Sequence, residues 1–311
     1  MPDPLQGLPR PSQLPRRRVT RDCIMGTSDS SIEVRSEAVN TNHGTELDSG
    51  ALKRKLVTLF RVFQEGGVVA ATTLLWQRID LHVRLFASRR VESVTLDGCT
   101  FNLKQIPNSP MKLVLLGGEY ESFERRAVLQ YVDPAQPVIE LGGCIGVVAC
   151  ITNRMLNDAR SHVVVEANPE VVPLLEESRL SNRCEFEIVN AAITYGQPFA
   201  TFSPSRDLWS NSISREDRGA TVTVPATRLR DIVEGRNFNS FTLICDIEGY
   251  EYELVLNEAD MLQKADTIIL ETHARVIGEA KTTQLLDRLK EIGFRMIDQE
   301  SIVVVMKRLR V

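Results

Sequence analysis

Acidic side chains and one histidine follow short apolar segments in the C-terminal half of the chain. Asp246 and Glu248 come after residues 241–245, and His273 comes after residues 268–270. Asp246 and Glu248 share a side if the strand persists, where the pair would orient a donor, bind a metal ion or act as a base. An imidazole has an ordinary pKa of about 6.5, which suits removal of a hydroxyl proton near neutral pH. The pattern therefore predicts proton transfer here, with a purely structural histidine as the alternative.

A glycine-rich stretch follows the apolar residues 138–141. Glycines let the backbone turn sharply and approach a ligand closely before a helix begins. Cys144 stands where the dinucleotide fingerprint G-x-G-x-x-G needs its second glycine, which disfavours a nicotinamide cofactor. An acid just before the glycines suits a ligand with a positive amino group and points to S-adenosylmethionine, with a structural strand-to-helix turn as the alternative. The ligand contacts expected in this stretch come from Glu140, Gly142, Gly143 and Gly146.

Two further segment ends carry groups suited to a nucleoside. Glu166 follows residues 163–165, about twenty residues after the glycines, where a carboxylate can accept both hydrogens of a ribose diol. Asn168 fits either the ligand site or the N-cap of a helix that begins at Pro169. At the next segment end, small side chains leave room for a flat base and an amide offers hydrogen bonds, although turn chemistry explains an asparagine there equally well. The two residues concerned are Asn190 and Ala191.

The elements that must position these residues form a regular alternation. After Pro137, short apolar segments are separated by stretches long enough for a helix, which predicts a parallel sheet covered on both faces. Residues 294–297 and 302–306 are joined by a short turn, so they form an antiparallel closing pair. Ligands of such sheets bind at the carboxyl ends of the strands, which is where the residues above fall.

Taken together, these segment ends resemble the FkbM family of S-adenosylmethionine-dependent methyltransferases. The family's glycine loop usually reads Asp-x-Gly-Ala-Asn-x-Gly, and Glu140, Gly143 and Cys144 replace its acid, alanine and asparagine. Ile244 stands where a lysine is common before the D-x-E-G motif. The similarity runs from about Gly118 to Ile302 and is carried by Gly118-x-Tyr120-Glu121, the glycine loop, Glu166 to Pro169, Ala192, Val224 to Val233, Asp246 to Glu251 and Ile269 to His273.

The resemblance implies an α/β fold and an activity. The fold is a Rossmann-like seven-stranded, mostly parallel sheet with one antiparallel strand, preceded by an N-terminal helical segment and a small hairpin. The cofactor is S-adenosylmethionine, and the activity is methyl transfer to a hydroxyl of a sugar, a glycolipid or a natural product.

Residue roles follow from the resemblance and from the chemistry. Because the sulfonium already activates the methyl group, the protein chiefly holds donor and acceptor in line and takes a proton. His273 or Asp246 is the expected proton acceptor, with Glu248 as a catalytic neighbour. No metal ligand is assigned, because nothing in their spacing demands a metal ion, but metal-assisted transfer stays open because the three side chains could converge. Residues 203–219 read equally well as a lid that stacks on a sugar ring or as an ordinary solvated loop. The residues expected at the acceptor are Tyr120, Glu121, Trp209 and Glu271.

The chain before this domain divides into two parts. Residues 1–48 hold prolines, three consecutive arginines and little apolar periodicity, which predicts a disordered tail or a docking segment. Residues 49–117 predict two helices and a hairpin that turns at Asp97-Gly98. The helices either pack on the main domain or rest on a membrane surface. The methyltransferase domain is expected over residues 118–311.

Composition limits the partners and the compartment. A formal net charge of −4 gives no general basic field, so nucleic acid is not an expected partner. The six cysteines include no C-x-x-C pair, which fits reduced thiols inside a cell. No segment approaches the roughly 20 apolar residues of a membrane span, so we expect a cytoplasmic protein that acts on a small-molecule or glycan acceptor. The sequence leaves open a peripheral membrane contact and a homo-oligomer.

Two other function classes compete with an O-methyltransferase. A catalytically silent protein would keep the fold as a binding or scaffold component, and Cys144 and Ile244 are its best support. Donor binding without turnover would favour it. A nicotinamide oxidoreductase is disfavoured by the interrupted glycine fingerprint.

Overall fold

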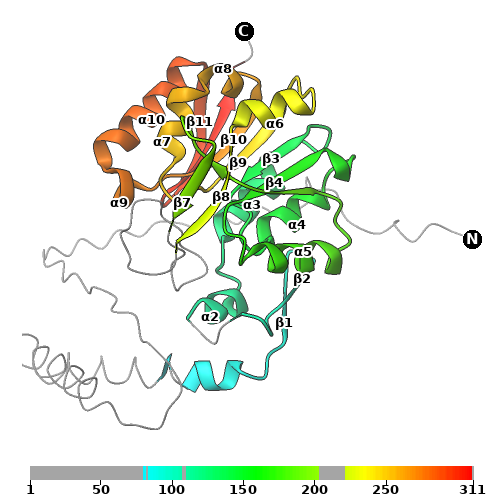
Figure 1. Ribbon diagram of the computed structural model, residues 1–311. Helices are drawn as coiled ribbons and strands as arrows, with labels where there is room; N and C mark the ends of the chain where they lie inside the picture. Colours follow the sequence, from blue (N-terminus) through cyan, green and yellow to red (C-terminus); the bar gives the residue numbers. More distant parts are fainter. Residues whose placement is uncertain (1–79, 82, 107–109, 203–220, 310–311) are drawn as a thin grey trace, which may run out of the picture. The chain divides into compact units, whose positions relative to one another are not determined.

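The computed structural model describes residues 80–81, 83–106, 110–202 and 221–309 (Figure 1). The expected tail over residues 1–48, most of the N-terminal helical segment and Trp209 in the expected lid lie outside the described residues. Within that segment, residues 80–81 and 83–88 are helical. No helix in the described part of the chain combines the length and the apolar character that crossing a bilayer requires.

The centre of the domain is a seven-stranded sheet in the order β11-β12-β10-β9-β3-β4-β5. Neighbours from β10 to β5 pair in parallel, and β12 pairs antiparallel with both β10 and β11. This is the mostly parallel sheet with one antiparallel strand that the sequence predicts. The strands are β3 (Val138–Leu141), β4 (His162–Glu166), β5 (Glu187–Asn190), β9 (Phe241–Cys245), β10 (Ala265–Glu271), β11 (Phe294–Glu300) and β12 (Val303–Arg308).

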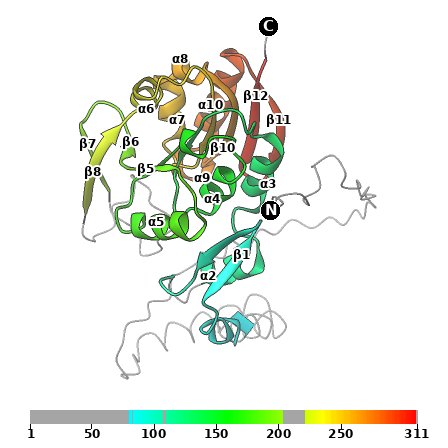
Figure 2. The same cartoon turned by 90° about the vertical axis from the view of Figure 1, so that its right-hand side faces the viewer.

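Helices cover both faces of this sheet, as Figure 2 shows. Successive side chains of a strand point to opposite faces, so Val138 and Ile139 belong to different apolar clusters. One cluster includes residues of α3 (Ser122–Tyr131), α4 (Val147–Asn153) and α5 (Val172–Ser181). The other includes residues of α6 (Leu229–Gly235), α7 (Glu251–Asn257), α8 (Ala259–Leu262) and α10 (Glu279–Glu291). Two buried faces explain why the central strands are continuously apolar.

The order of the strands creates a reversal point beside β3. The chain proceeds from β3 to β4 and β5 on one side, and later places β9 and β10 on the other side of β3. A crevice opens at such a point outside the carboxyl ends of the strands, and this is where open α/β sheets bind ligands. The residues that follow β3, β9 and β10 therefore meet at one edge of the sheet.

Smaller elements lie outside the main sheet. The predicted hairpin is present as β1 (Ser93–Leu96) and β2 (Cys99–Asn102), and Asp97 and Gly98 both have positive φ angles, as a two-residue turn of this kind needs. Helices α2 (Pro110–Gly117) and α9 (Ala274–Ile277) are short. A three-stranded sheet that the sequence did not predict contains β6 (Ala192–Ile193), β7 (Phe199–Phe202) and β8 (Val222–Thr227).

Candidate functional site

The carboxyl ends of β3, β9 and β10 enclose a small acidic pocket. Its volume is about 20 Å³, room for about one water molecule. None of the described residues that line it is basic. Its apolar wall includes Leu141, Val148 and Ile244. The five carboxyl groups that line it belong to Glu121, Glu124, Glu140, Asp246 and Glu271.

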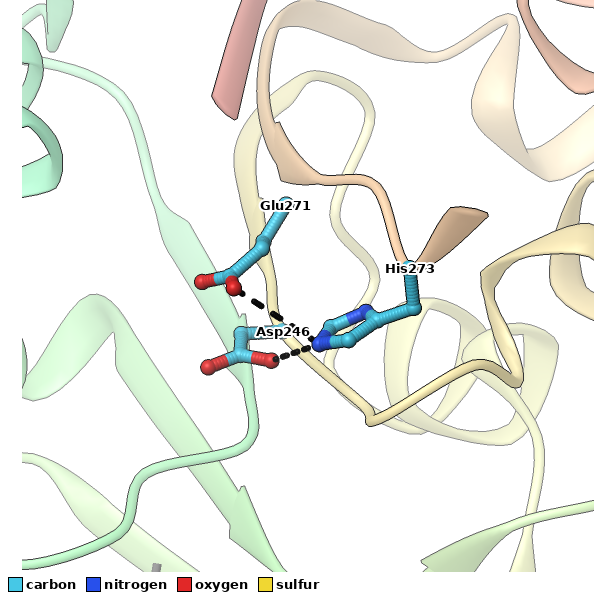
Figure 3. Close-up of side chains that lie close together, drawn as sticks. All are labelled: Asp246, Glu271 and His273. Atoms are coloured by element: carbon cyan, nitrogen blue, oxygen red, sulfur yellow. Dashed lines mark ion pairs between the residues drawn. The ribbon is translucent and has the colours of Figure 1, made fainter. Parts of the chain in front are cut away.

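His273 lies among carboxylates from three elements. Its Nε2 atom is 3.5 Å from Asp246 Oδ1 and 3.6 Å from an oxygen of each of Glu271 and Glu248. Figure 3 shows Asp246 and Glu271 pointing toward the imidazole ring. The structure thus brings together Asp246, Glu248 and His273, which the sequence predicts as catalytic, and adds Glu271, which was expected at the acceptor.

Glu251 contacts the His273 ring on the side opposite to the other carboxylates. Its Oε1 atom lies 2.9 Å from Nδ1 of His273 and accepts backbone N–H groups from Ile247, at 2.9 Å, and Gly249, at 3.2 Å. The chain turns back here because Glu248 and Gly249 have φ angles of 54° and 103°. Glu251 lies in the first turn of α7 and is fully buried against the loop and the imidazole.

The ionisation of the cluster follows from burial and from the crowding of charges. Burial lowers the pKa of His273, but the hydrogen bond and charge of Glu251 and the charges of Asp246 and Glu271 outweigh it, and the pKa is raised to about 9. Burial raises the pKa of Glu271 to about 7 and that of Asp246 well above its usual range. At neutral pH His273 is therefore mostly protonated, a state that donates a proton and does not accept one.

Glu124 is a pocket residue that sequence reasoning missed. It lies in the first turn of α3, and a hydrogen bond between Glu124 and Glu271 contributes to the pKa of both carboxyl groups. One position before the helix, Glu121 has a φ angle of 46° and also lines the pocket. Acids at positions 121 and 124, at the start of a helix, are the only sign of this role in the sequence. The fold is needed to show that the first turn of α3 faces β10.

Arg125 fixes the segment that carries Tyr120 and Glu121. Its buried guanidinium donates hydrogen bonds to the carbonyl oxygens of Tyr120 and Gly118 and forms an ion pair with Asp97 of the hairpin turn. Tyr120 is itself buried, and burial raises the pKa of its hydroxyl. Tyr120 therefore belongs to the core beneath the pocket, and Glu121 to the pocket itself.

The glycine loop after β3 is packed tightly against its surroundings. A Cβ atom on Gly142 would lie 1.7 Å from the carbonyl oxygen of Asp246, and one on Gly143 would lie 2.3 Å from Val164 Cγ1. The loop N–H groups of Gly142 and Gly143 both donate to the carbonyl of Val165. These glycines are needed for close approach of the loop to β9 and β4, in addition to any room that they leave for a ligand.

Glu166 ties the ends of β4 and β3 together. Its carboxylate accepts the N–H group of Cys144 at 2.8 Å and that of Asn168 at 2.6 Å. Cys144 has a φ angle of 43°, an unusual backbone conformation that this hydrogen bond helps to hold. The amide of Asn190 donates to the carbonyl of Glu166 at 2.8 Å, so three of the expected donor-binding residues form one network.

Asn168 and Ala191 are placed slightly differently from expectation. The helix after Asn168 is α5, which begins at Val172 and not at Pro169, because residues 169–171 first form a turn. Asn168 is fully buried and accepts the N–H group of Glu170 in that turn. Ala191 is buried directly after β5.

Glu140 is buried beside a second histidine. Its Oε2 atom lies 3.5 Å from Nε2 of His162, and neither atom has a hydrogen-bond partner among the described residues. Burial raises the pKa of Glu140 well above its usual range and lowers that of His162 to about 3. His162 is therefore neutral at pH 7, and the pair is not an ion pair.

Comparisons with solved structures give low sequence identities. An O-methyltransferase from Bacillus cereus in complex with SAH is 12% identical, with 74% of this chain and 88% of that chain covered and a TM-score of 0.38. Aeropyrum pernix fibrillarin with natively bound S-adenosyl-L-methionine is 11% identical, with 56% and 66% covered and a TM-score of 0.35. A protein of the NADB-Rossmann superfamily from Streptococcus agalactiae is 12% identical, with 60% and 67% covered and a TM-score of 0.36. None of these three similarities carries the assignment.

The assignment rests on a family model. No curated protein matches the chain. The model of the methyltransferase FkbM domain matches residues 140–296, which is about half of the chain and includes the glycine loop, Glu166, the β9 loop and His273. The chain therefore belongs to the FkbM family of S-adenosylmethionine-dependent methyltransferases.

Proposed function

We propose that the protein transfers the methyl group of S-adenosylmethionine to a hydroxyl group of a sugar, a glycolipid or a natural product. The observation that carries this proposal is the acidic pocket beside the glycine loop, with the His273 cluster at its end. A sulfonium and an amino group both carry positive charge, and this pocket presents carboxyl groups without a basic residue among the described ones. Because the pocket has a volume of about 20 Å³, it has room for one group of about the size of a water molecule, such as the ammonium group of the donor.

Glu140, Gly142 and Asp246 are the donor contacts that we propose within the pocket, because all three line it. Gly143 and Gly146 shape the same loop from behind, where their missing side chains let it approach Val164 and Leu175. These two glycines act through packing and not through direct contact with the donor.

We place the ribose of the donor against Glu166. Backbone N–H groups of Cys144, Asn168 and Ala167 bond to this carboxylate, which offers about four lone-pair positions. The remaining capacity suits a hydroxyl of the ribose. Asn190 and Ala191 lie at the end of the adjacent strand β5, and we place the adenine next to them. Asn168 holds the turn that follows β4.

The reaction is an in-line displacement. The acceptor oxygen attacks the methyl carbon, the carbon–sulfur bond breaks, and S-adenosylhomocysteine leaves with the bonding electron pair. The hydroxyl proton passes to a carboxylate of the cluster, Asp246, Glu248 or Glu271, which the protonated His273 holds together by its charge. We place the acceptor hydroxyl next to Glu271 and Glu121, with Trp209 stacking on the acceptor. The contribution of the protein is alignment of the two reactants and removal of this proton.

Calorimetric titration of the full chain with S-adenosylmethionine, S-adenosylhomocysteine and NAD tests the donor. We expect saturable binding of the first two and none of NAD. A mass-spectrometric screen of hydroxylated sugars, glycolipids and polyketides for a gain of one methyl group then tests the acceptor. Donor binding without turnover on any acceptor would support the catalytically silent alternative, and binding of NAD alone would overturn the proposal.

A further inference from the structure

The distances around His273 do not fit ordinary hydrogen bonds. A charge-assisted N–H to O bond spans about 2.7 to 2.9 Å, whereas Nε2 of His273 lies 3.5 to 3.6 Å from oxygens of Asp246, Glu271 and Glu248 at the same time. Ligand atoms bound at about 2.1 Å to one divalent ion lie about 3 to 3.5 Å from each other. The distances from Nε2 to these oxygens therefore fit the shell around an ion better than a set of direct hydrogen bonds.

The other nitrogen of the ring supports the same interpretation. A histidine that binds a metal ion through one nitrogen usually donates the N–H group of the other to a carboxylate, which fixes the tautomer and the direction of the ring. Nδ1 of His273 lies 2.9 Å from the fully buried Glu251, so Nε2 is aimed at Asp246 and Glu271.

One atom that faces the centre of the cluster also lacks a partner. Asp246 Oδ1 is buried and has no hydrogen-bond partner among the described residues. It lies 3.5 Å from His273, whose side chain is nine-tenths buried, at 10% exposure. Buried polar atoms of native proteins are almost always satisfied, so Asp246 Oδ1 points to a ligand at the centre.

We propose that this cluster is a divalent cation site. The ligand atoms are Asp246 Oδ1, Glu271 Oε1 and His273 Nε2, which lie within 4.8 Å of one another. Glu248 is close enough to supply a further oxygen. Three or four protein ligands leave coordination positions for water or for an oxygen of the acceptor. The site goes beyond the methyl transfer proposed above and does not depend on the donor.

The ligand set indicates the kind of ion. Carboxylate oxygens favour Mg²⁺, Ca²⁺ and Mn²⁺, whereas an imidazole favours transition metals, so a set of two or three carboxylates with one imidazole fits Mn²⁺ best.

Titration of the metal-stripped full chain with MnCl₂, without donor, tests the site. We expect one Mn²⁺ ion per chain by calorimetry and by loss of the free-ion electron paramagnetic resonance signal. Glu271→Gln and His273→Gln should each weaken Mn²⁺ binding by about tenfold or more. Glu253→Gln is the matched control. It removes an acid from the first turn of α7, where Glu251 also lies, and Glu253 is not one of the carboxylates that face His273. It should leave the affinity unchanged.

A measurement on the unaltered protein guards against variants that fail to fold. In its complex with Mn²⁺, pulsed electron paramagnetic resonance should detect coupling to one ¹⁴N nucleus from the imidazole. The proposal is overturned by absence of Mn²⁺ binding at millimolar concentration, by bound Mn²⁺ without nitrogen coupling, or by equal affinity in folded Glu271→Gln and His273→Gln.

This experiment is separate from the test of the methyl donor. Mn²⁺ is added without S-adenosylmethionine, and the donor titration can be run in the presence of a chelator. If either the Mn²⁺ ion or the methyl donor fails to bind, the result for the other can still be interpreted.

Discussion

The Glu251 carboxylate lies 2.9 Å from Nδ1 of His273 and accepts the N–H groups of Ile247 and Gly249 through the same oxygen. One fully buried acid therefore sets the path of the β9–α7 loop and the direction of the imidazole. The loop presents Asp246 and Glu248 to Nε2 on the other side of the ring. The geometry of the cluster thus depends on a residue that does not line the pocket.

Removal of this acid should destabilise the domain. In Glu251→Ala two backbone N–H groups and the imidazole lose a buried acceptor, which costs about 3 to 5 kcal/mol of unfolding free energy. Glu253→Ala, in the same helical turn, should change it by less than about 1 kcal/mol. Urea unfolding followed by circular dichroism measures both. Equal stability of the two variants would contradict the role assigned to Glu251.

Substitution in the glycine loop should be costly for a steric reason. In Gly142→Ala the new Cβ would lie 1.7 Å from the Asp246 carbonyl oxygen on a backbone with a φ angle of 94°, so we expect a loss of about 3 kcal/mol or more. Gly235→Ala is the control, because open space surrounds that position at the end of α6. It should be neutral or stabilise by up to about 1 kcal/mol. Thermal unfolding of the two proteins compares them directly.

The ribose contact predicts a selective loss of donor affinity. Glu166→Ala removes the carboxylate that we place against the ribose and also frees the N–H groups of Cys144 and Asn168. We expect the dissociation constant for S-adenosylhomocysteine to rise about tenfold or more. Glu170→Ala, an exposed acid four residues later, should leave it unchanged. Calorimetry on both variants makes the test, and unaltered affinity in Glu166→Ala would remove this residue from the ribose site.

The buried histidine of β4 should make the protein sensitive to acid. The pKa of His162 is about 3 in the folded protein and about 6.5 when unfolded, so the unfolded state binds more protons between these values. His162 therefore lowers stability as the pH falls through this window, by about 1.4 kcal/mol for each pH unit. Above pH 6.5 it has no effect.

His162→Gln isolates this contribution. Its stability should fall less steeply than that of the unaltered protein between pH 6 and pH 4. Glu140, the titratable group that faces His162, is present in both proteins, so its own contribution cancels in the difference. Parallel slopes of unfolding free energy against pH would show that His162 does not titrate as its burial requires.

The proposed proton transfer predicts a split between turnover and binding. His273→Gln should lower the rate of methyl transfer about a hundredfold or more. The donor affinity should stay within about twofold, since His273 does not line the pocket beside the glycine loop. Glu253→Gln again serves as the control. Single-turnover kinetics separate the two effects, and full activity would exclude His273 from the reaction.

Much of the architecture follows from pattern alone. Short apolar segments with helix-length gaps predict the parallel sheet, and the short link before Val303 predicts its antiparallel closing pair. The convergence of Asp246 and His273 follows from the same rule, since parallel strands bring their carboxyl ends to one edge.

The remaining features depend on interactions that no local pattern carries. Glu124 reaches Glu271 only because α3 packs near the end of β10, and Glu251 reaches His273 only because two successive residues adopt positive φ angles. The small sheet of β6, β7 and β8 pairs residues on both sides of a long connection, which a scan for periodicity does not detect. The raised pKa of Glu140 is a consequence of its burial, whereas its sequence position alone suggests an ordinary charged ligand for an amino group.

The backbone contact between Gly142 and Asp246 joins the two loops at the carboxyl ends of β3 and β9. The N–H group of Asp246 donates to the carbonyl of Leu141, and the Asp246 carbonyl occupies the space where a Gly142 side chain would lie. Main chain, and not flexible side chains, therefore holds the glycine loop and the β9–α7 loop together. If the protein acts as we propose, the gap between the methyl group and the proton acceptor is set by this backbone contact, so that loops farther out can change the acceptor without loss of alignment.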